Sequence, residues 1–231
     1  MPLVYHASAG PQRLGGPVSA PWFTPRVARP RVTNDEQLLA AAQRLLYEVG
    51  PAEFTLARAA AQAGVSAATL IKRFGSKRQL FLALNRRWVD SIGPGLAAAT
   101  AGHQTPLARL RAAATWGFAD LDSPPDTANQ LATLALDLQD AGMQELLAEG
   151  WRIVTDRLTE LAKEAIEAGE LPTRLPAEQV ARILFAAAEG IRLTWCVRPS
   201  GSLVAQAEAD LGAVLTALTA GQMSPAGDGQ R

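Results

Sequence analysis

Cysteine and histidine are almost absent from this chain of 231 residues. A single cysteine, Cys196, excludes a disulfide within the chain and is typical of a protein kept in a reducing compartment. The two histidines, His6 and His103, are too few for a conventional metal site built from histidine and cysteine. We therefore expect the protein to hold neither a metal nor another cofactor.

Long hydrophobic runs and catalytic motifs are absent as well. No uncharged apolar run approaches the roughly 18 residues that a membrane-spanning helix needs, so we expect no membrane partner. The first residues lack the basic and then apolar pattern of a signal peptide, which predicts a cytoplasmic protein. The sequence contains no glycine-rich phosphate loop and no G-x-S-x-G motif, so it does not suggest an enzyme.

The formal net charge of zero hides an uneven distribution along the chain. Residues 26–89 contain 11 lysines and arginines against 4 acidic residues, whereas residues 90–231 contain 10 against 18. Such a basic segment indicates a binding site for a polyanion such as DNA. A basic surface that merely faces solvent is the alternative explanation.

Signals for helix starts and stops divide the chain into about nine helices, so we predict an all-α protein. The predicted helices cover residues 34–50, 56–63, 67–74, 77–100, 106–121, 126–140, 143–168, 176–197 and 203–220. Gly93-Pro94 should either kink the fourth of these helices or break it with a turn. Residues 1–33 form a basic leader rich in proline and glycine, and this leader and the tail 221–231 are predicted to be disordered.

Residues 55–74 have the pattern of two short helices joined by a sharp turn. Gly64 can adopt the positive φ that such a turn needs, and Leu70 and Phe74 can pack inward. The other face of the second helix would then be free to enter a DNA major groove. A plain helical hairpin inside a core is the alternative.

The stretch from Leu38 to Leu84 resembles the DNA-binding domain of the TetR family of transcriptional repressors. The matching residues, in order, are Ala41-Ala42, Gly50, Thr55, Ala60, Ala63-Gly64-Val65-Ser66, Thr69-Leu70, Phe74, Ser76-Lys77 and Leu80-Phe81. The resemblance implies a homodimeric repressor that binds a palindromic operator in double-stranded DNA and is released by a small lipophilic or aromatic effector. It also implies a DNA-binding domain over residues 34–80 and a ligand-binding and dimerisation domain over residues 81–220.

The resemblance further implies that the DNA-bound protein is located at the nucleoid. It also implies which residues contact DNA. They are Thr55, Ser66, Ala67, Ala68, Thr69, Ile71, Lys72, Arg73 and Lys77. Lys77 would meet a phosphate, and Ile71, which stands where the family usually has an aromatic residue, could touch a thymine methyl. Arg26, Arg29 and Arg31 could form an arm in the minor groove or simply add positive charge.

Two further sites are expected in the second domain. An apolar effector pocket, or else an ordinary core, would contain Trp116, Leu134, Asp137, Met143, Leu147 and Trp151, with Gln139 and Arg152 as further polar contacts. Apolar stripes on the last two helices would form a four-helix dimer interface, or else the core of one subunit. Their members are Leu184, Ala187, Ile191, Trp195, Leu211, Leu215 and Leu218. A helical carrier that does not bind DNA is the rival to the repressor.

Overall fold

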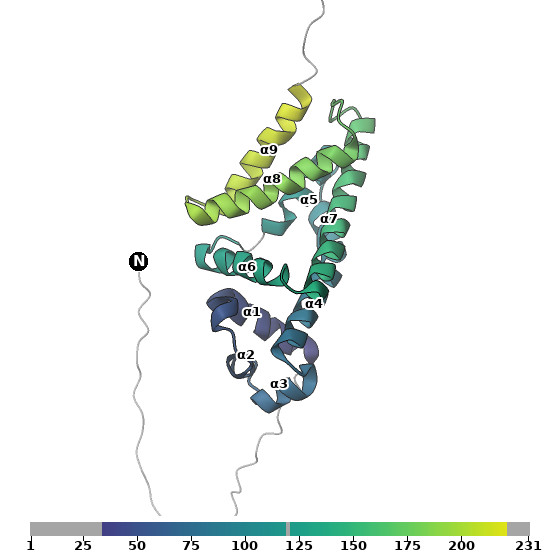
Figure 1. The fold of residues 1–231 in the computed structure, drawn as a ribbon. Coiled ribbons are helices and arrows are strands. Elements are labelled where there is room, and N and C mark those ends of the chain that lie inside the picture. Colours follow the sequence, from purple (N-terminus) through teal and green to yellow (C-terminus); the bar gives the residue numbers. More distant parts are fainter. Residues whose placement is uncertain (1–33, 119–120, 221–231) are drawn as a thin grey trace, which may run out of the picture. The chain divides into compact units, whose positions relative to one another are not determined.

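The computed structural model describes residues 34–118 and 121–220 (Figure 1). The predictions for the leader 1–33, its three arginines and the tail 221–231 fall outside these residues. Within the described residues the chain forms nine α-helices, one 3₁₀ turn and no strand, which confirms the all-α prediction. The helices are α1 Asp35–Glu53, α2 Leu56–Gln62, α3 Ala67–Phe74, α4 Lys77–Thr100, α5 Pro106–Thr115, α6 Pro124–Asp137, α7 Ala141–Glu167, α8 Ala177–Val197 and α9 Leu203–Ala220.

The first four helices begin where their capping residues predict. The side chains of Asn34, Thr55, Ser66 and Ser76 each accept a hydrogen bond from the backbone N–H three residues further on. Each bond satisfies one of the N–H groups that a helix start leaves without a partner. These boundaries depend on neighbours in the sequence, which is why the sequence predicts them well.

The predicted limits of α4 are confirmed, but the ends predicted for α5 and α6 were wrong, and α5 ends at Thr115 instead of residue 121. The structure continues α4 through Gly93-Pro94, so of the two alternatives given for this pair the break is wrong. The structure also ends α6 at Asp137, and Asp140 caps α7 by accepting hydrogen bonds from the N–H groups of Gly142 and Met143. Asp137 and Asp140 therefore do not share a helix, because Asp140 acts as a cap rather than as a helical residue.

The helices surround two clusters of buried residues. We call residues 35–84 the head and residues 85–220 the body. The head cluster contains Leu70, Leu80 and Phe81, and it also takes in Met143 from α7. The body cluster joins the second half of α4 to α5, α7, α8 and α9. Because α4 supplies side chains to both clusters, the expected domain boundary between residues 80 and 81 falls within a single helix.

Contacts between helices connect the head to the body. α1 packs against α6, and α4 runs beside α7 (Figure 1). Asn129 of α6 donates a hydrogen bond to the carbonyl oxygen of Tyr47 at 2.6 Å. Within the described residues, no helix is both long enough and apolar enough to cross a membrane.

Candidate DNA-binding surface and effector cavity

The turn between α2 and α3 has the geometry that the sequence predicts. Gly64 has a φ of +69°. Its N–H donates to the carbonyl of Ala61 at 3.1 Å, and the N–H of Val65 donates to the carbonyl of Ala60 at 3.0 Å. This pair of bonds is a Schellman motif, which ends α2 sharply, so that α3 runs in a different direction.

Helix α3 has one buried side and one open side. Leu70 is fully buried in the head cluster, and Ala67 is half-buried against it. The exposed residues of α3 are Ala68, Thr69, Ile71, Lys72 and Arg73. Ile71 leaves 48% of its surface exposed. The open side of α3 therefore presents two apolar side chains, one hydroxyl and two cations, and Ala67 contributes little to it.

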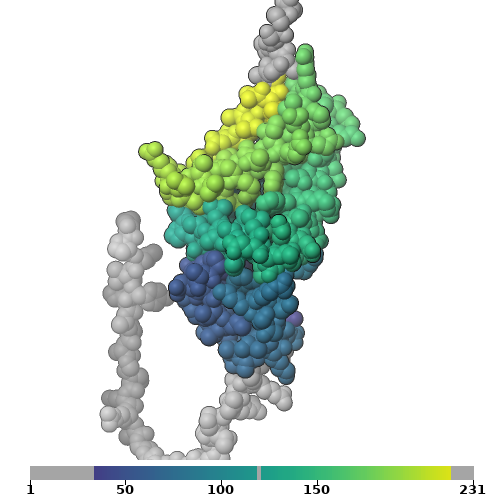
Figure 2. All heavy atoms as spheres, in the orientation of Figure 1, coloured from purple at the N-terminus to yellow at the C-terminus, as the bar shows by residue number. Residues whose placement is uncertain are grey.

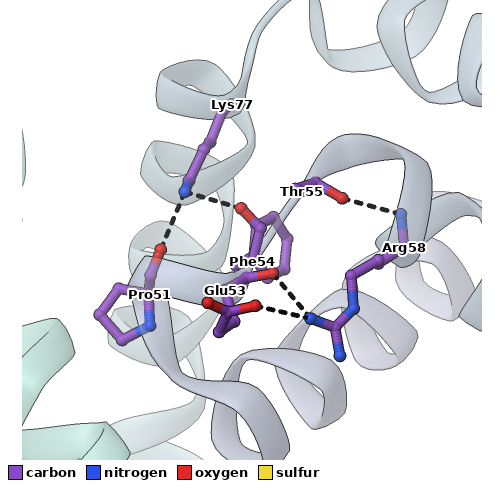
Figure 3. Close-up of polar contacts among 6 residues, drawn as sticks. All are labelled: Pro51, Glu53, Phe54, Thr55, Arg58 and Lys77. Atoms are coloured by element: carbon purple, nitrogen blue, oxygen red, sulfur yellow. Dashed lines mark hydrogen bonds and ion pairs between the residues drawn. The ribbon is translucent and has the colours of Figure 1, made fainter.

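Lys77 points into the head, not outward to a phosphate (Figure 3). Its ammonium donates hydrogen bonds to the carbonyl oxygens of Pro51 at 2.9 Å and Phe54 at 2.8 Å. It also lies 5.5 Å from the ring centroid of Phe54 and 5.4 Å from that of Phe81. The positive φ of Gly50 interrupts α1 just before these carbonyls, so they need a donor from elsewhere. These bonds hold α4 to the end of α1, so in this structure the Lys77 ammonium is not free for the predicted phosphate contact.

The remaining cations near α3 differ in their partners. Arg73 forms an ion pair with Asp35, at the start of α1. Arg78 makes two hydrogen bonds to Asp140, at 2.6 and 2.9 Å. Lys72 takes part in no ion pair among residues 34–118 and 121–220, so its ammonium is available to a phosphate.

A partly open cavity of about 390 Å³ lies mostly among the body helices, with Tyr47 of the head in its wall. This volume lies within the range of small-molecule sites, which is about 300–1,000 Å³. Most of the wall is aromatic and apolar: Tyr47, Trp88, Trp116, Phe118, Leu121, Trp151, Val154, Leu158 and Phe185. Trp151 and Phe185 meet edge to face with centroids 5.5 Å apart. A polar edge is supplied by Gln130 and by Glu189 and Arg192, which pair at 3.4 Å.

A second cavity, of about 140 Å³, adjoins the first. Tyr47, Trp88 and Gln130 line both cavities. The smaller one is also lined by Gln43, Leu46, Phe81, Leu84, Asn85, Thr133, Leu134, Asp137 and Leu147. Residues from the head and from the body thus meet around it.

The predicted effector residues are divided between these two cavities. Trp116 and Trp151 line the larger cavity, and Leu134, Asp137 and Leu147 line the smaller one. Met143 lines neither, because its side chain is buried in the head cluster.

The two additional polar candidates are corrected. Gln139 is exposed, and Arg152 is exposed and pairs with Asp156 at 2.8 Å. Neither of these side chains lines the two cavities.

Tyr47 and Trp88 line the larger cavity but were not predicted from the sequence. Tyr47 belongs to a helix that the motif assigns to DNA binding, so nothing local indicated a ligand. The one feature of the sequence that relates to Trp88 is a glycine in a helix far along the chain. A Cβ atom added to Gly150 would lie 2.3 Å from the Trp88 ring, so only glycine leaves room for that ring. Gly95 makes the same room for Trp116, with a closest approach of 2.6 Å.

The predicted dimer stripes are mostly core residues of a single chain. Leu184, Ile191, Trp195, Leu211 and Leu215 are buried in the body cluster, and Ala187 and Leu218 are partly buried against it. The opposite sides of the same helices are exposed. On α8 they carry Ala186, Gly190, Leu193, Thr194 and Val197, and on α9 Ala205, Ala209, Ala213, Thr216 and Ala217. Leu193 and Val197 leave 55% and 81% of their surface exposed.

Two family models match the chain in the order that the fold suggests. Residues 38–84 match the model of bacterial regulatory proteins of the tetR family. Residues 106–220 match the model of the C-terminal domain of BetI-type transcriptional repressors. The chain belongs to the TetR family. It is therefore a transcriptional regulator with a helix-turn-helix DNA-binding domain and not an enzyme.

Solved structures share this TetR-family fold at low sequence identity. A transcriptional regulator from Saccharomonospora viridis in complex with choline has a TM-score of 0.69 and 17% identity, covering 78% of this chain and 94% of that one. A TetR transcription regulator from Haloarcula marismortui has a TM-score of 0.66 and 23% identity, covering 79% and 96%. The regulator FadR from Bacillus subtilis in complex with stearoyl-CoA has a TM-score of 0.62 and 21% identity, covering 81% and 99%. No curated protein matches the chain in sequence.

Proposed function

We propose that this TetR-family regulator is a ligand-responsive homodimeric repressor that binds a palindromic operator and is released by a small lipophilic or aromatic effector. One observation carries the proposal: Tyr47, a residue of the DNA-binding head, forms part of the wall of the aromatic cavity. A ligand in that cavity would touch the head directly. It can then bind one head position more tightly than another, which is what a ligand must do to change DNA affinity.

The proposed effector follows from the cavity itself. Solved relatives with choline or stearoyl-CoA bound are at most 21% identical, so their ligands do not define this one. The wall here offers tryptophan, tyrosine and phenylalanine rings with one short polar edge. Such a wall favours an aromatic or lipophilic molecule with few polar groups.

The proposed DNA contacts are the exposed residues of α3 together with the two caps that precede α2 and α3. They are Thr55, Ser66, Ala68, Thr69, Ile71, Lys72 and Arg73, with Ala67 at the margin. The hydroxyls of Ser66 and Thr69 lie 2.9 Å apart, so they would act on DNA as a pair. The proposed division of the chain remains a DNA-binding head and a body for ligand binding and dimerisation, joined through α4.

The proposed dimer interface is the exposed side of α8 and α9, which replaces the buried stripes. The two helices pack against each other and lie side by side on the face that Figure 2 shows, α8 in light green and α9 in yellow. Small residues at helical spacing allow close approach of a second pair of helices. Two exposed apolar side chains one turn apart, Leu193 and Val197, would be covered by the partner subunit.

One series of measurements tests the proposal. The protein is first used to select duplexes from a random DNA pool, and affinity is then measured by fluorescence anisotropy with and without the neutral aromatic probe 4-phenylbutan-1-ol. We expect a palindromic site, salt-sensitive binding and release by the probe. Val154→Trp, which fills the larger cavity, should abolish release without abolishing DNA binding. Failure to select any sequence would favour a helical carrier without DNA binding.

Light scattering tests the dimer. Leu193→Glu combined with Val197→Glu should yield a folded monomer that binds DNA weakly, because charges on an apolar interface remain unpaired. Leu138→Glu is the matched control, since Leu138 is an apolar residue with 48% of its surface exposed on another part of the body. A double variant that stays dimeric would contradict the proposed interface.

A further inference from the structure

Asp137 is a buried carboxylate that lacks a full set of partners. It is the last residue of α6, and only 3% of its surface is exposed. Its Oδ1 atom is buried and has no hydrogen-bond partner. The side chain lines the smaller cavity, beside Asn85 of α4 and Thr133 of α6. A buried carboxylate oxygen without a donor is costly, so its position in a cavity wall calls for a reason.

No cation of the protein neutralises this group within the described residues. Asp137 takes part in none of their ion pairs, and Tyr47 is the one other titratable side chain that lines the smaller cavity there. The nearby carboxylate Asp140 is already held by Arg78. On α4, Arg87 is bonded to Gln43 and Glu36. Burial raises the pKa of Asp137 to about 6, while Asn85 lowers it as a hydrogen-bond donor and Asp140 raises it by repulsion.

The smaller cavity is continuous in its lining with the aromatic one. Tyr47, Trp88 and Gln130 belong to both walls. A molecule with its apolar part among the rings of the larger cavity could therefore place one end near Asp137. The cavity of about 140 Å³ has room for a small polar head group. Tyrosine and tryptophan rings also attract cations through their faces.

We propose that the smaller cavity is a subsite for the ammonium group of a cationic aromatic or lipophilic effector, and that Asp137 is the residue that recognises it. This proposal rests on the proposed effector cavity and names the chemical class of the molecule that fills it. An ammonium in this cavity replaces the buried lone charge of the Asp137 carboxylate with an ion pair. Because Gln43 and Tyr47 of α1 also line the subsite, its occupant contacts the DNA-binding head.

Three probes with the same hydrocarbon part test the charge preference: 4-phenylbutylammonium, 4-phenylbutan-1-ol and 4-phenylbutyrate. Calorimetry at pH 7.5 should give an affinity for the ammonium about tenfold or more above that for the alcohol, since a hydrogen bond to a charged group is stronger than a neutral one. The carboxylate probe should bind most weakly. Equal binding of the ammonium and the alcohol, or no binding of the ammonium, would overturn the proposal.

Two further measurements assign the preference to Asp137. Asp137→Asn should remove it, whereas Asp156→Asn should keep it, because Asp156 is an exposed carboxylate on α7 that pairs with Arg152. In the unmodified protein the preference should fall about tenfold between pH 7.5 and pH 5, where Asp137 is mostly protonated and the probe remains charged. A preference that persists in Asp137→Asn, or that does not change with pH, would also overturn the proposal.

The same probes separate this inference from the proposed function. If the alcohol and the ammonium release DNA equally well, the repressor function stands and the cationic subsite is wrong. If the ammonium binds through Asp137 but leaves DNA affinity unchanged, the subsite stands and the proposed regulation is wrong.

Discussion

Two charged side chains near α4 are withdrawn from water, and their surroundings are opposite. Lys77, in the head, donates to two carbonyl oxygens and lies against two aromatic rings. Asp137, where the head meets the body, has a buried oxygen with no donor. The hydrogen-bonded lysine is part of the scaffold, since its bonds connect α4 to α1. The incompletely paired charge weakens the fold, and such a group is a candidate for binding a ligand.

The largest effect on stability is expected from a buried apolar residue of α8, compared with an exposed one on the same helix. Trp195 is 2% exposed and Leu193 is 55% exposed, although they are only two residues apart. Trp195→Ala should lower the free energy of unfolding by about 3–5 kcal/mol, whereas Leu193→Ala should change it by about 0.5 kcal/mol or less within one subunit. Urea unfolding checks the first value. For this measurement Trp195→Ala is introduced into the monomeric variant that carries Leu193→Glu and Val197→Glu. Similar losses at both positions would mean that α8 is oriented differently.

Lys77→Met should destabilise the protein by about 1–3 kcal/mol, because it leaves the carbonyl oxygens of Pro51 and Phe54 without a donor. Methionine keeps most of the apolar stem, so the loss reports on the ammonium. Thermal and urea unfolding provide the measurement, with Lys72→Met as the control that should unfold like the parent protein. A stable Lys77→Met variant with reduced DNA affinity would instead restore Lys77 as a phosphate contact.

Asp137→Asn should act in the opposite direction and stabilise the protein above pH 6. The pKa of Asp137 rises from 3.8 to about 6 on folding because burial disfavours its charged form. Between these values the folded state binds more protons than the unfolded state, so this group lowers the stability as the pH rises through that window. A shift of about two units corresponds to at most about 3 kcal/mol, and we expect about 1–2 kcal/mol after solvent screening in the cavity.

Unfolding of both proteins between pH 3.5 and pH 8 checks this value. The advantage of Asp137→Asn should be absent near pH 3.5 and complete above about pH 6.5. A constant difference at all pH values would mean that the asparagine changes packing and not ionisation.

Substitution of Lys72 should have the smallest effect on stability but a clear effect on DNA binding. Lys72→Met should leave the unfolding transition unchanged and reduce the slope of log affinity against log salt concentration by about 0.9, the value for one phosphate contact. Anisotropy titrations at several salt concentrations measure this slope. Lys77→Met should leave it unaltered, which makes the two lysines a matched pair.

Local structure followed from the sequence where neighbouring residues decide it. The caps at Asn34, Thr55, Ser66 and Ser76 and the turn at Gly64 depend on residues within one helical turn. The junction of α6 and α7 was misjudged for the converse reason. Asp140 caps α7 while it is bonded to Arg78, whose position 62 residues earlier in the chain no local pattern reveals.

By itself the sequence determined the helix-turn-helix, the all-α fold and the apolar stripes of the last helices. A stripe at helical spacing shows that residues share one side of a helix, but not whether their own chain or a second subunit covers it. Tertiary structure decided that question for Trp195 and Leu211, which are buried in one chain. It also turned Lys77 inward and left Asp137 beside a cavity, because the bonding partners of a charge come from distant parts of the chain.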